Sequence, residues 1–345
     1  MKIKKYVIGK LDSVYAVSSI RINDEIYFIA ATEKEGKCLI FSPNNWESSV
    51  VWDEPGGTMS ITSLKGKDNI LFAIQRFFPI FKAENATIVY AILDNRISMK
   101  WKVKHIIDMP FVHRIEAVKI GNYPYLIAST VCGGKNFKDD WSKPGAIYIS
   151  RIPENLDGGW NFNRICGGLS KNHGMHLANI NNKNIIYFSA KEGVFVLKIF
   201  TDNIKNWRIE QIIDREVSDI YVSDIDNDGK YEIITIEPFH GNELKIYKYF
   251  RNKWRPIYRK SINFGHVVWG GNILNKQSII IGNRGGDKDL LLIQPNECNL
   301  KKMGYKVIDK NVGPTQILVE HKDNCEIILS ANNHIGEIAL YVLKH

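Results

Sequence analysis

The chain has 345 residues, of which 44% are hydrophobic and 24% charged, the balance typical of a soluble globular protein with a large core. Lys and Arg outnumber Asp and Glu by 46 to 37, and the net charge of +9 favours anionic partners. No stretch approaches the roughly 18 uncharged apolar residues of a membrane span, so we expect no membrane-spanning helix.

The start of the chain and the spread of charged and cysteine residues argue against further classes. The N-terminal segment is basic but has no apolar stretch and no small-residue cleavage site, so we predict a cytoplasmic protein. Lysines are spread along the chain and form no block of five, which argues against nucleic acid as the partner. The five cysteines are odd in number and no C-x-x-C pair occurs, which argues against a disulfide framework.

Short β-type runs recur along the chain with a period of about 45 to 60 residues, separated by Gly, Asn, Asp and Pro. In each unit, a first run that enters a central channel precedes an apolar second strand, a third strand and a polar fourth strand. In chain order the second strands are IYFIAAT, ILFAIQ, YLIAST, IIYFSA, YEIITI, SIIIGN and EIILSA. The third strands are KCLIFS, TIVYAIL, AIYISRI, GVFVLKI, LKIYKYF, LLLIQP and EIALYVL.

The fourth strands are one fewer than the others. They are SSVVWDE, KWKVKHIID, WNFNRIC, NWRIEQIID, KWRPIYR and GYKVID. The segment KKYVIGKLD at the N-terminus supplies the missing one. Pairing the first and last segments of a chain in one blade removes the open edges of a circular array. The pattern therefore predicts an all-β, seven-bladed β-propeller whose N-terminal strand closes the last blade.

We expect a single domain over residues 1–345. The blades should span about 13–55, 56–108, 109–169, 170–215, 216–261, 262–310 and 311–345, with residues 1–12 completing the last. An array of β-sandwiches is the alternative that the strand pattern leaves open.

One unit contains an acidic loop within SDIYVSDIDNDGKYEIIT. Asp224, Asp226 and Asp228 alternate ahead of Gly229, with Glu232 further on, so their side chains can converge on one hard cation. The loop resembles the calcium-binding repeats of FG-GAP and VCBS propellers, which implies a structural Ca²⁺ ion in this blade. The alternative is a solvated Asp/Asn turn without a metal.

Alignment of the units on their second strands brings polar side chains into register at the start of the inner strands. These are His113, His173, Ser218 and His266, followed three positions later by Glu116, His176, Tyr221 and Trp269. The loops between second and third strands lie on the same face and bring Arg76, His240, Arg284 and His334. Six of the nine histidines therefore map to one face, which predicts an acid–base site or a divalent metal site in the channel.

A seven-bladed propeller with His-led inner strands resembles the propeller polysaccharide lyases, including ulvan lyases and rhamnose–glucuronate lyases. It also resembles the related α-L-rhamnosidases and the propeller part of aldos-2-ulose dehydratase. These resemblances imply His and Tyr as proton-transfer groups and a basic group that neutralises a uronate carboxylate. On this sequence the match covers the inner-strand histidines and the nearby Arg and Tyr, and we predict the catalytic residues His113, His173, Tyr221 and His266. Together with the register of the units, it gives the candidate substrate-binding residues Arg76, Glu116, His176, His240, Trp269, Arg284 and His334.

We therefore predict a carbon–oxygen lyase that cleaves a uronate-containing oligosaccharide, of the rhamnosyl-glucuronate type, by β-elimination. The partner is an acidic carbohydrate. A base must remove the C5 proton, and an acid must protonate the leaving oxygen. The candidates are His113 or His173 as base and Tyr221 or His266 as acid.

A positive group must stabilise the enediolate that develops at the carboxylate. The candidates are Arg76, Arg284 or a metal held by the histidines. Two other functions stay open, a glycoside hydrolase on the same scaffold and a non-catalytic interaction propeller. A hydrolase usually needs two carboxylates at a fixed separation, and Glu116 is the inner-strand carboxylate that the alignment supplies.

Overall fold

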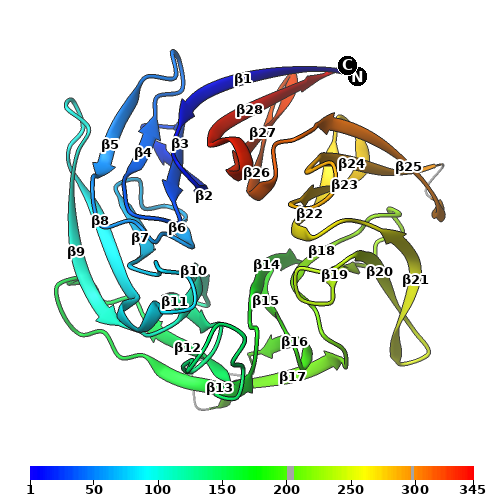
Figure 1. Cartoon of the computed structure of the whole chain (residues 1–345), viewed down its shortest axis with the longest axis horizontal. Coiled ribbons are helices and arrows are strands. Elements are labelled where there is room, and N and C mark those ends of the chain that lie inside the picture. Colours follow the sequence, from blue (N-terminus) through cyan, green and yellow to red (C-terminus); the bar gives the residue numbers. More distant parts are fainter. Residues whose placement is uncertain (200–205, 297–298) are drawn as a thin grey trace.

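The computed structural model describes residues 1–199, 206–296 and 299–345. Its strands form seven four-stranded sheets, arranged as blades around a central axis (Figure 1). The all-β, seven-bladed propeller predicted from the sequence is confirmed. We number the blades 1 to 7 by the chain order of their innermost strands.

The strands of the first four blades follow one another from the axis outward. Blade 1 contains β2 (Val14–Ile22), β3 (Glu25–Thr32), β4 (Cys38–Phe41) and β5 (Ser48–Trp52). Blade 2 contains β6 (Ile61–Ser63), β7 (Ile70–Gln75), β8 (Thr87–Asn95) and β9 (Lys100–Asp108). Blade 3 contains β10 (Val112–Ile120), β11 (Tyr123–Thr130), β12 (Gly145–Arg151) and β13 (Asn163–Leu169). Blade 4 contains β14 (Gly174–Ile180), β15 (Lys183–Ala190), β16 (Gly193–Lys198) and β17 (Arg208–Ile213).

The last three blades complete the ring. Blade 5 contains β18 (Asp219–Ser223), β19 (Glu232–Glu237), β20 (Glu243–Phe250) and β21 (Lys253–Ser261). Blade 6 contains β22 (Gly265–Ile273), β23 (Lys276–Asn283), β24 (Leu290–Asn296) and β25 (Asn299–Asp309). Blade 7 contains β26 (Pro314–Lys322), β27 (Cys325–Asn332), β28 (Glu337–Lys344) and, outermost, β1 (Lys2–Lys10).

The second strand of each blade is an apolar run because both of its faces pack against neighbouring sheets. In β23, Ile279, Ile280 and Ile281 are all fully buried. The outermost strands alternate instead, since one face meets solvent: in β9, Trp101 is buried between exposed lysines. The core therefore consists of the interfaces between neighbouring blades, and the inner strands surround the central axis.

The ring closes through the two ends of the chain, which lie side by side (Figure 1). β1 pairs antiparallel with β28, with Ile3 opposite Leu343 and Tyr6 opposite Leu340. The predicted pairing of the N-terminal segment beside EIALYVL is thus confirmed. Lys5 of β1 also forms ion pairs of 2.8 Å with Asp309 of blade 6 and 2.7 Å with Glu337.

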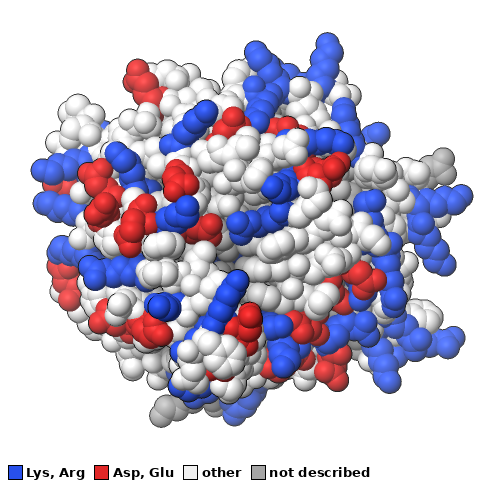
Figure 2. Space-filling view, in the orientation of Figure 1, with Lys and Arg blue, Asp and Glu red and all other residues white. Residues whose placement is uncertain are grey.

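The described residues include two helices of three residues each, η1 (Ala83–Asn85) and η3 (Asn333–Ile335). Neither is long and apolar enough to cross a bilayer. Figure 2 shows Lys and Arg spread over one face and its rim, with Asp and Glu among them and a largely uncharged, hollowed centre.

Candidate functional site

A cavity of about 200 Å³ lies at the axis, where the inner strands begin. Its polar lining comprises Tyr15, Glu33, His113, Lys135, His173, His240, His266 and Arg284. Its aromatic lining comprises Phe77, Phe81, Phe111, Trp141, Phe239 and Phe264. The cavity is smaller than the roughly 300–1,000 Å³ of sites for drug-sized ligands, so it suits one small ring or a chain end.

Local β-bulges aim several of these side chains at the axis. In β2, β10 and β22 the pairing with the second strand shifts around one residue, which is Tyr15, His113 and His266 respectively. An extra residue in a strand bends the backbone and re-aims its side chain. The same irregularity recurs at the start of three blades, so it presents three equivalent side chains to one cavity.

Four histidines meet in this cavity, and they come from four consecutive blades. The ring centroids of His113 and His173 are 4.5 Å apart, and those of His173 and His266 are 5.2 Å apart. His240, from the loop between β19 and β20, lies 5.0 Å from both His173 and His266. The structure therefore brings together four of the six histidines that the alignment placed on one face.

These imidazoles are neutral at neutral pH. Burial, together with the charge of Arg114, lowers the pKa of His113 well below its usual value. Burial likewise lowers the pKa of His173 and His266 far below the usual range, and that of His240 to about 3. Each ring therefore keeps a lone pair on one nitrogen, which can accept a proton or bind a metal.

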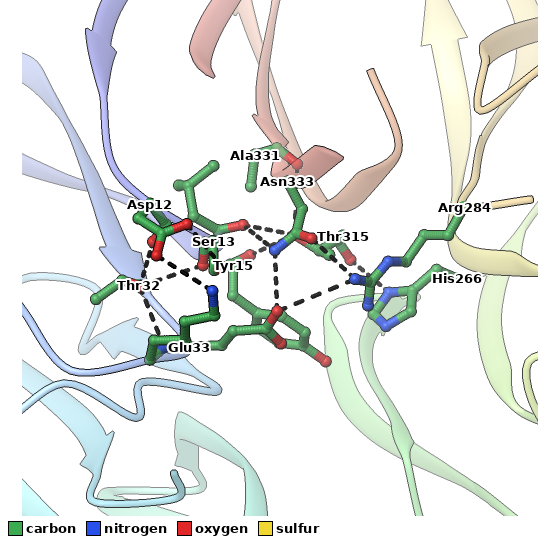
Figure 3. A network of polar contacts seen from close by, with 12 residues as sticks. Asp12, Ser13, Tyr15, Thr32, Glu33, His266, Arg284, Thr315, Ala331 and Asn333 are labelled. Carbon is green, nitrogen blue, oxygen red and sulfur yellow. Dashed lines mark hydrogen bonds and ion pairs between the residues drawn. The ribbon is translucent and has the colours of Figure 1, made fainter. Parts of the chain in front are cut away.

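Glu33 and Arg284 form a polar bridge across the cavity rim, with Asn333 between them (Figure 3). The Arg284 guanidinium donates to Asn333 Oδ1 at 2.8 Å and lies 4.0 Å from Glu33 Oε1. Asn333 Nδ2 donates to the same Glu33 oxygen at 3.1 Å. Burial raises the pKa of Glu33, and the positive charge of Arg284 opposes that rise.

The alignment contained a signal for two lining residues that it did not use. Tyr15 occupies the position in blade 1 that His113 occupies in blade 3, because Val14 and Val112 both pair with the last residue of their second strand. Glu33 directly follows a second strand, as Arg284 does. The register thus places Tyr15 in the cavity, whereas for Glu33 it gives only a candidate, because Arg76 also directly follows its second strand and lies outside the cavity.

A third residue, Lys135, reaches the cavity from the loop between β11 and β12. Its ammonium lies 3.3 Å from the centroid of Trp141 and donates to the backbone oxygens of Lys138 and Asp140, each at 2.9 Å. Burial lowers the pKa of Lys135. Within the described residues Lys135 forms no ion pair, so its charge is available to an anion that enters the cavity.

Arg76 and His334 lie elsewhere, although the alignment placed them with the other loop residues. Arg76 is exposed and lines a groove of blade 2 together with His105. His334 is also exposed, and its Nε2 lies 2.9 Å from Lys288 Nζ. Loops of different length and conformation connect the second and third strands, so a shared register does not give their side chains a shared direction.

Glu116, His176, Tyr221 and Trp269 form a separate layer further along the channel. Three residues of a strand advance it by roughly 10 Å, so these side chains do not line the cavity. His176 stacks on Tyr221 with ring centroids 3.8 Å apart, and burial lowers the pKa of His176 to about 4. Burial raises the pKa of Glu116 to about 7, although a 3.3 Å hydrogen bond from Thr62 opposes the rise.

The acidic loop of blade 5 closes around a lysine. Lys248 Nζ of β20 lies 2.5 Å from Asp226, 2.7 Å from Asp228 and 3.2 Å from Glu232. The fourth carboxylate, of Asp224, accepts hydrogen bonds from the backbone N–H groups of Asp228 and Gly229 at 3.1 and 2.9 Å. A calcium ion in this loop would have to compete with the Lys248 ammonium.

The calcium prediction from the sequence is tested by replacing that ammonium. We expect calcium to raise the melting temperature of the protein, and to raise that of Lys248→Met further, because the variant leaves the carboxylates without their internal cation. A free calcium concentration of 100 times Kd adds about 2.7 kcal/mol to the free energy of unfolding. Thermal melts with calcium and with a chelator measure the shift.

The matched control is Lys253→Met, which removes an exposed lysine on the next strand and should respond to calcium as the unchanged protein does. Identical melting curves with calcium and with the chelator, in all three proteins, would exclude a calcium site in this loop. Because the loop lies in one blade and away from the cavity lining, turnover should not depend on calcium.

A larger groove of about 910 Å³ lies beside blades 2 and 3, but polar groups that line it already bind one another. Within it, Lys104 Nζ pairs with Asp157 at 2.7 Å, and the Tyr90 hydroxyl donates to the same carboxylate. The ion pair and the hydrogen bond occupy the polar atoms of these three side chains. The axial cavity is therefore the better candidate for a functional site.

Comparisons with known proteins show the fold alone. No family model and no curated protein matches the chain. The structure of Sqt1 from Saccharomyces cerevisiae matches with a TM-score of 0.58 and 11% identity, covering 96% of this chain and 84% of that one. A functionally unknown protein from Desulfotomaculum acetoxidans matches with a TM-score of 0.54 and 9% identity, covering 85% of each chain. The chain is thus similar to these solved structures in architecture, and the comparisons do not support the resemblance to lyases.

Proposed function

We propose that the protein is a carbon–oxygen lyase that cleaves a uronate-containing oligosaccharide by β-elimination. The observation that supports this function best is the composition of one small cavity, where neutral imidazoles, a phenol and two cationic side chains face the same space. Aromatic faces complete the lining and suit the apolar face of a sugar ring. The cavity admits one ring, so we expect cleavage at a chain end.

The two cationic groups would bind the uronate carboxylate. Arg284 offers a planar guanidinium that can bind a carboxylate through two parallel hydrogen bonds. Lys135 adds a point charge that has no carboxylate partner among the described residues. Neutralising the carboxylate makes the neighbouring C5 proton more acidic and stabilises the enediolate that forms when this proton leaves.

His113 and Tyr15 would transfer the protons. The Tyr15 hydroxyl lies 3.4 Å from His113 Nε2, and both side chains line the cavity. The neutral imidazole has a lone pair for the C5 proton, and the negative charge that develops on the substrate would raise the pKa that burial holds low. Burial raises the pKa of Tyr15 to about 12, so its hydroxyl keeps the proton that the leaving oxygen needs. In this role Tyr15 replaces Tyr221, which lies in the separate layer further along the channel.

A hydrolase mechanism has weaker support from the same cavity. Two carboxyl groups on opposite sides of the bond are the usual requirement. Among the described residues that line the cavity, Glu33 is the only one with a carboxylate, and it already contacts Asn333 and Arg284. This shortage favours elimination over hydrolysis.

The test is incubation with rhamnosyl-glucuronate and other uronate oligosaccharides, followed by ultraviolet absorbance. Only elimination leaves a C4–C5 double bond conjugated to the carboxylate, so an absorbing product is expected. Cleavage without an absorbing product would replace the lyase by a hydrolase. No reaction and no binding across a broad panel of acidic glycans would favour an interaction propeller.

Two arginine variants test the carboxylate clamp. Arg284→Gln should lower kcat/KM by about 100-fold, because a charge-assisted bidentate contact to the enediolate is lost. Arg76→Gln is the matched control: its side chain is exposed and outside the cavity, so kcat/KM should stay unchanged. Equal losses in both variants, or in neither, would show that Arg284 does not bind the reacting carboxylate.

A further inference from the structure

Three of the cavity histidines present nitrogen atoms to a single point. One ring nitrogen of each of His173, His240 and His266 lies within 4.8 Å of the other two. The Nε2 atoms of His173 and His240 are 3.5 Å apart. Two imidazoles bound to one zinc ion at about 2.0–2.1 Å in tetrahedral geometry hold their nitrogens roughly 3.3 Å apart. His173 and His240 thus have the spacing of two ligands of one ion, and a His266 nitrogen lies within 4.8 Å of both.

The local hydrogen bonds orient one of these rings for metal binding. His266 Nδ1 lies 2.9 Å from the backbone oxygen of Thr315 and, in the neutral ring, must donate its proton there. This leaves the Nε2 lone pair free. Thr315 is itself fixed, because its hydroxyl donates to the backbone oxygen of Tyr15 at 3.0 Å (Figure 3). A carbonyl that accepts the other N–H of a ligating histidine is the usual support of such a site.

His173 lacks an adequate partner without an ion. Its side chain is 2% exposed, and the described residues offer its ring no partner other than His240 Nε2. At 3.5 Å this contact is at the limit of a hydrogen bond between neutral rings. A metal ion would take up the lone pairs of both nitrogens at once.

We propose that His173, His240 and His266 bind one divalent transition-metal ion, with a further coordination position open to the axial cavity. Imidazole ligands suit zinc, copper, iron and nickel, whereas calcium and magnesium require oxygen ligands. Three protein ligands with an open position are typical of reactive zinc sites rather than structural ones. The carboxylate of Glu33 lines the same cavity and would offset part of the ion's charge.

The proposal does not depend on lyase activity and concerns binding alone. Tyr15, Glu33 and Arg284 line the same cavity as the three histidines, so a ligand that reaches the metal would also meet these groups. A carboxylate or phosphate oxygen is the class of ligand that would complete the coordination, because the neighbouring cations favour an anion.

The experiment titrates the chelator-treated full chain with Co²⁺ and Zn²⁺. We expect one equivalent of Co²⁺ to bind with visible absorption bands and Zn²⁺ to displace it, whereas Ca²⁺ does not compete. His240→Ala should weaken binding by more than about 100-fold, because even loss of an outer-shell partner costs about 10–100-fold. His240 lies in a half-buried loop, so this variant should fold; its far-ultraviolet circular dichroism checks that it does.

His334→Ala is the matched control, since this exposed histidine lies outside the cavity and its loss should leave Co²⁺ affinity unchanged. His266→Ala provides the second ligand variant. Absence of Co²⁺ binding in the folded chain, or binding of equal strength in His240→Ala and the unchanged protein, would overturn the proposal. Metal binding without an unsaturated product would leave this site standing and count against the lyase, so the two failures are distinguishable.

Discussion

Deletion of residues 1–10 should prevent the propeller from closing and remove most of its stability. The deletion takes away the whole of β1, and with it the pairing to β28 and the ion pairs of Lys5 with Asp309 and Glu337. It leaves β28 paired with β27 on one side only and exposes its other edge. Whole domains have a free energy of unfolding of only about 5–15 kcal/mol. The loss of a complete strand should therefore abolish the cooperative melt near the original temperature.

Thermal melting and size-exclusion chromatography measure this effect. The truncated chain should aggregate, because an exposed edge strand pairs with other chains. Lys5→Met is the control, since it removes the ion pairs but keeps the strand, and partly exposed ion pairs contribute about 1 kcal/mol or less. A truncated chain that melts like the full one would contradict closure by β1.

The fold was predictable from the sequence because the number of strands of each type can be counted along the chain. The apolar second strands and the third strands each number seven in the sequence, and the fourth strands fall short by one that the N-terminus supplies. Any fold that pairs its ends in this way must be circular. The observed pairing of Ile3 with Leu343 follows from that count and needs no side-chain detail.

The cavity was predictable most directly where the backbone imposes a direction on the side chain. His113 and His266 sit in equivalent bulges of equivalent strands, so register alone places them together. Arg76, His240, Arg284 and His334 all sit in loops, whose conformation differs from blade to blade, and only His240 and Arg284 of these four line the cavity. Lys135 was missed because a long loop carries it to the cavity.

The acidic loop of blade 5 shows a different limit of prediction from a sequence motif. Asp224, Asp226 and Asp228 follow one another in the sequence and signal a cation site by themselves. Lys248, which fills the space between two of them and Glu232, lies on the next strand of the blade. Its contact depends on the pairing of β19 with β20, and a motif read along the chain does not contain that information.

Replacing His113 by Phe should lower turnover of a uronate substrate by about 100-fold or more, because a proton-transfer group typically contributes about 10²–10⁴-fold. This prediction rests on the lyase proposal. The ring is 5% exposed and packs between Phe77 and His173, with centroid distances of 5.4 and 4.5 Å. His113 Nδ1 has no hydrogen-bond partner among the described residues, so an apolar ring of similar shape sacrifices little there.

The stability of His113→Phe should therefore stay within about 1.5 kcal/mol of the unchanged protein, as for other volume-conserving core changes. Tyr15→Phe removes only the hydroxyl that lies 3.4 Å from His113 Nε2, and it should lower turnover in the same way. His105→Ala is the control, because this exposed histidine of β9 lies outside the cavity. Turnover of His113→Phe equal to that of His105→Ala would exclude His113 as the base. A loss of turnover with an unchanged melting temperature would separate a chemical role for His113 from a structural one.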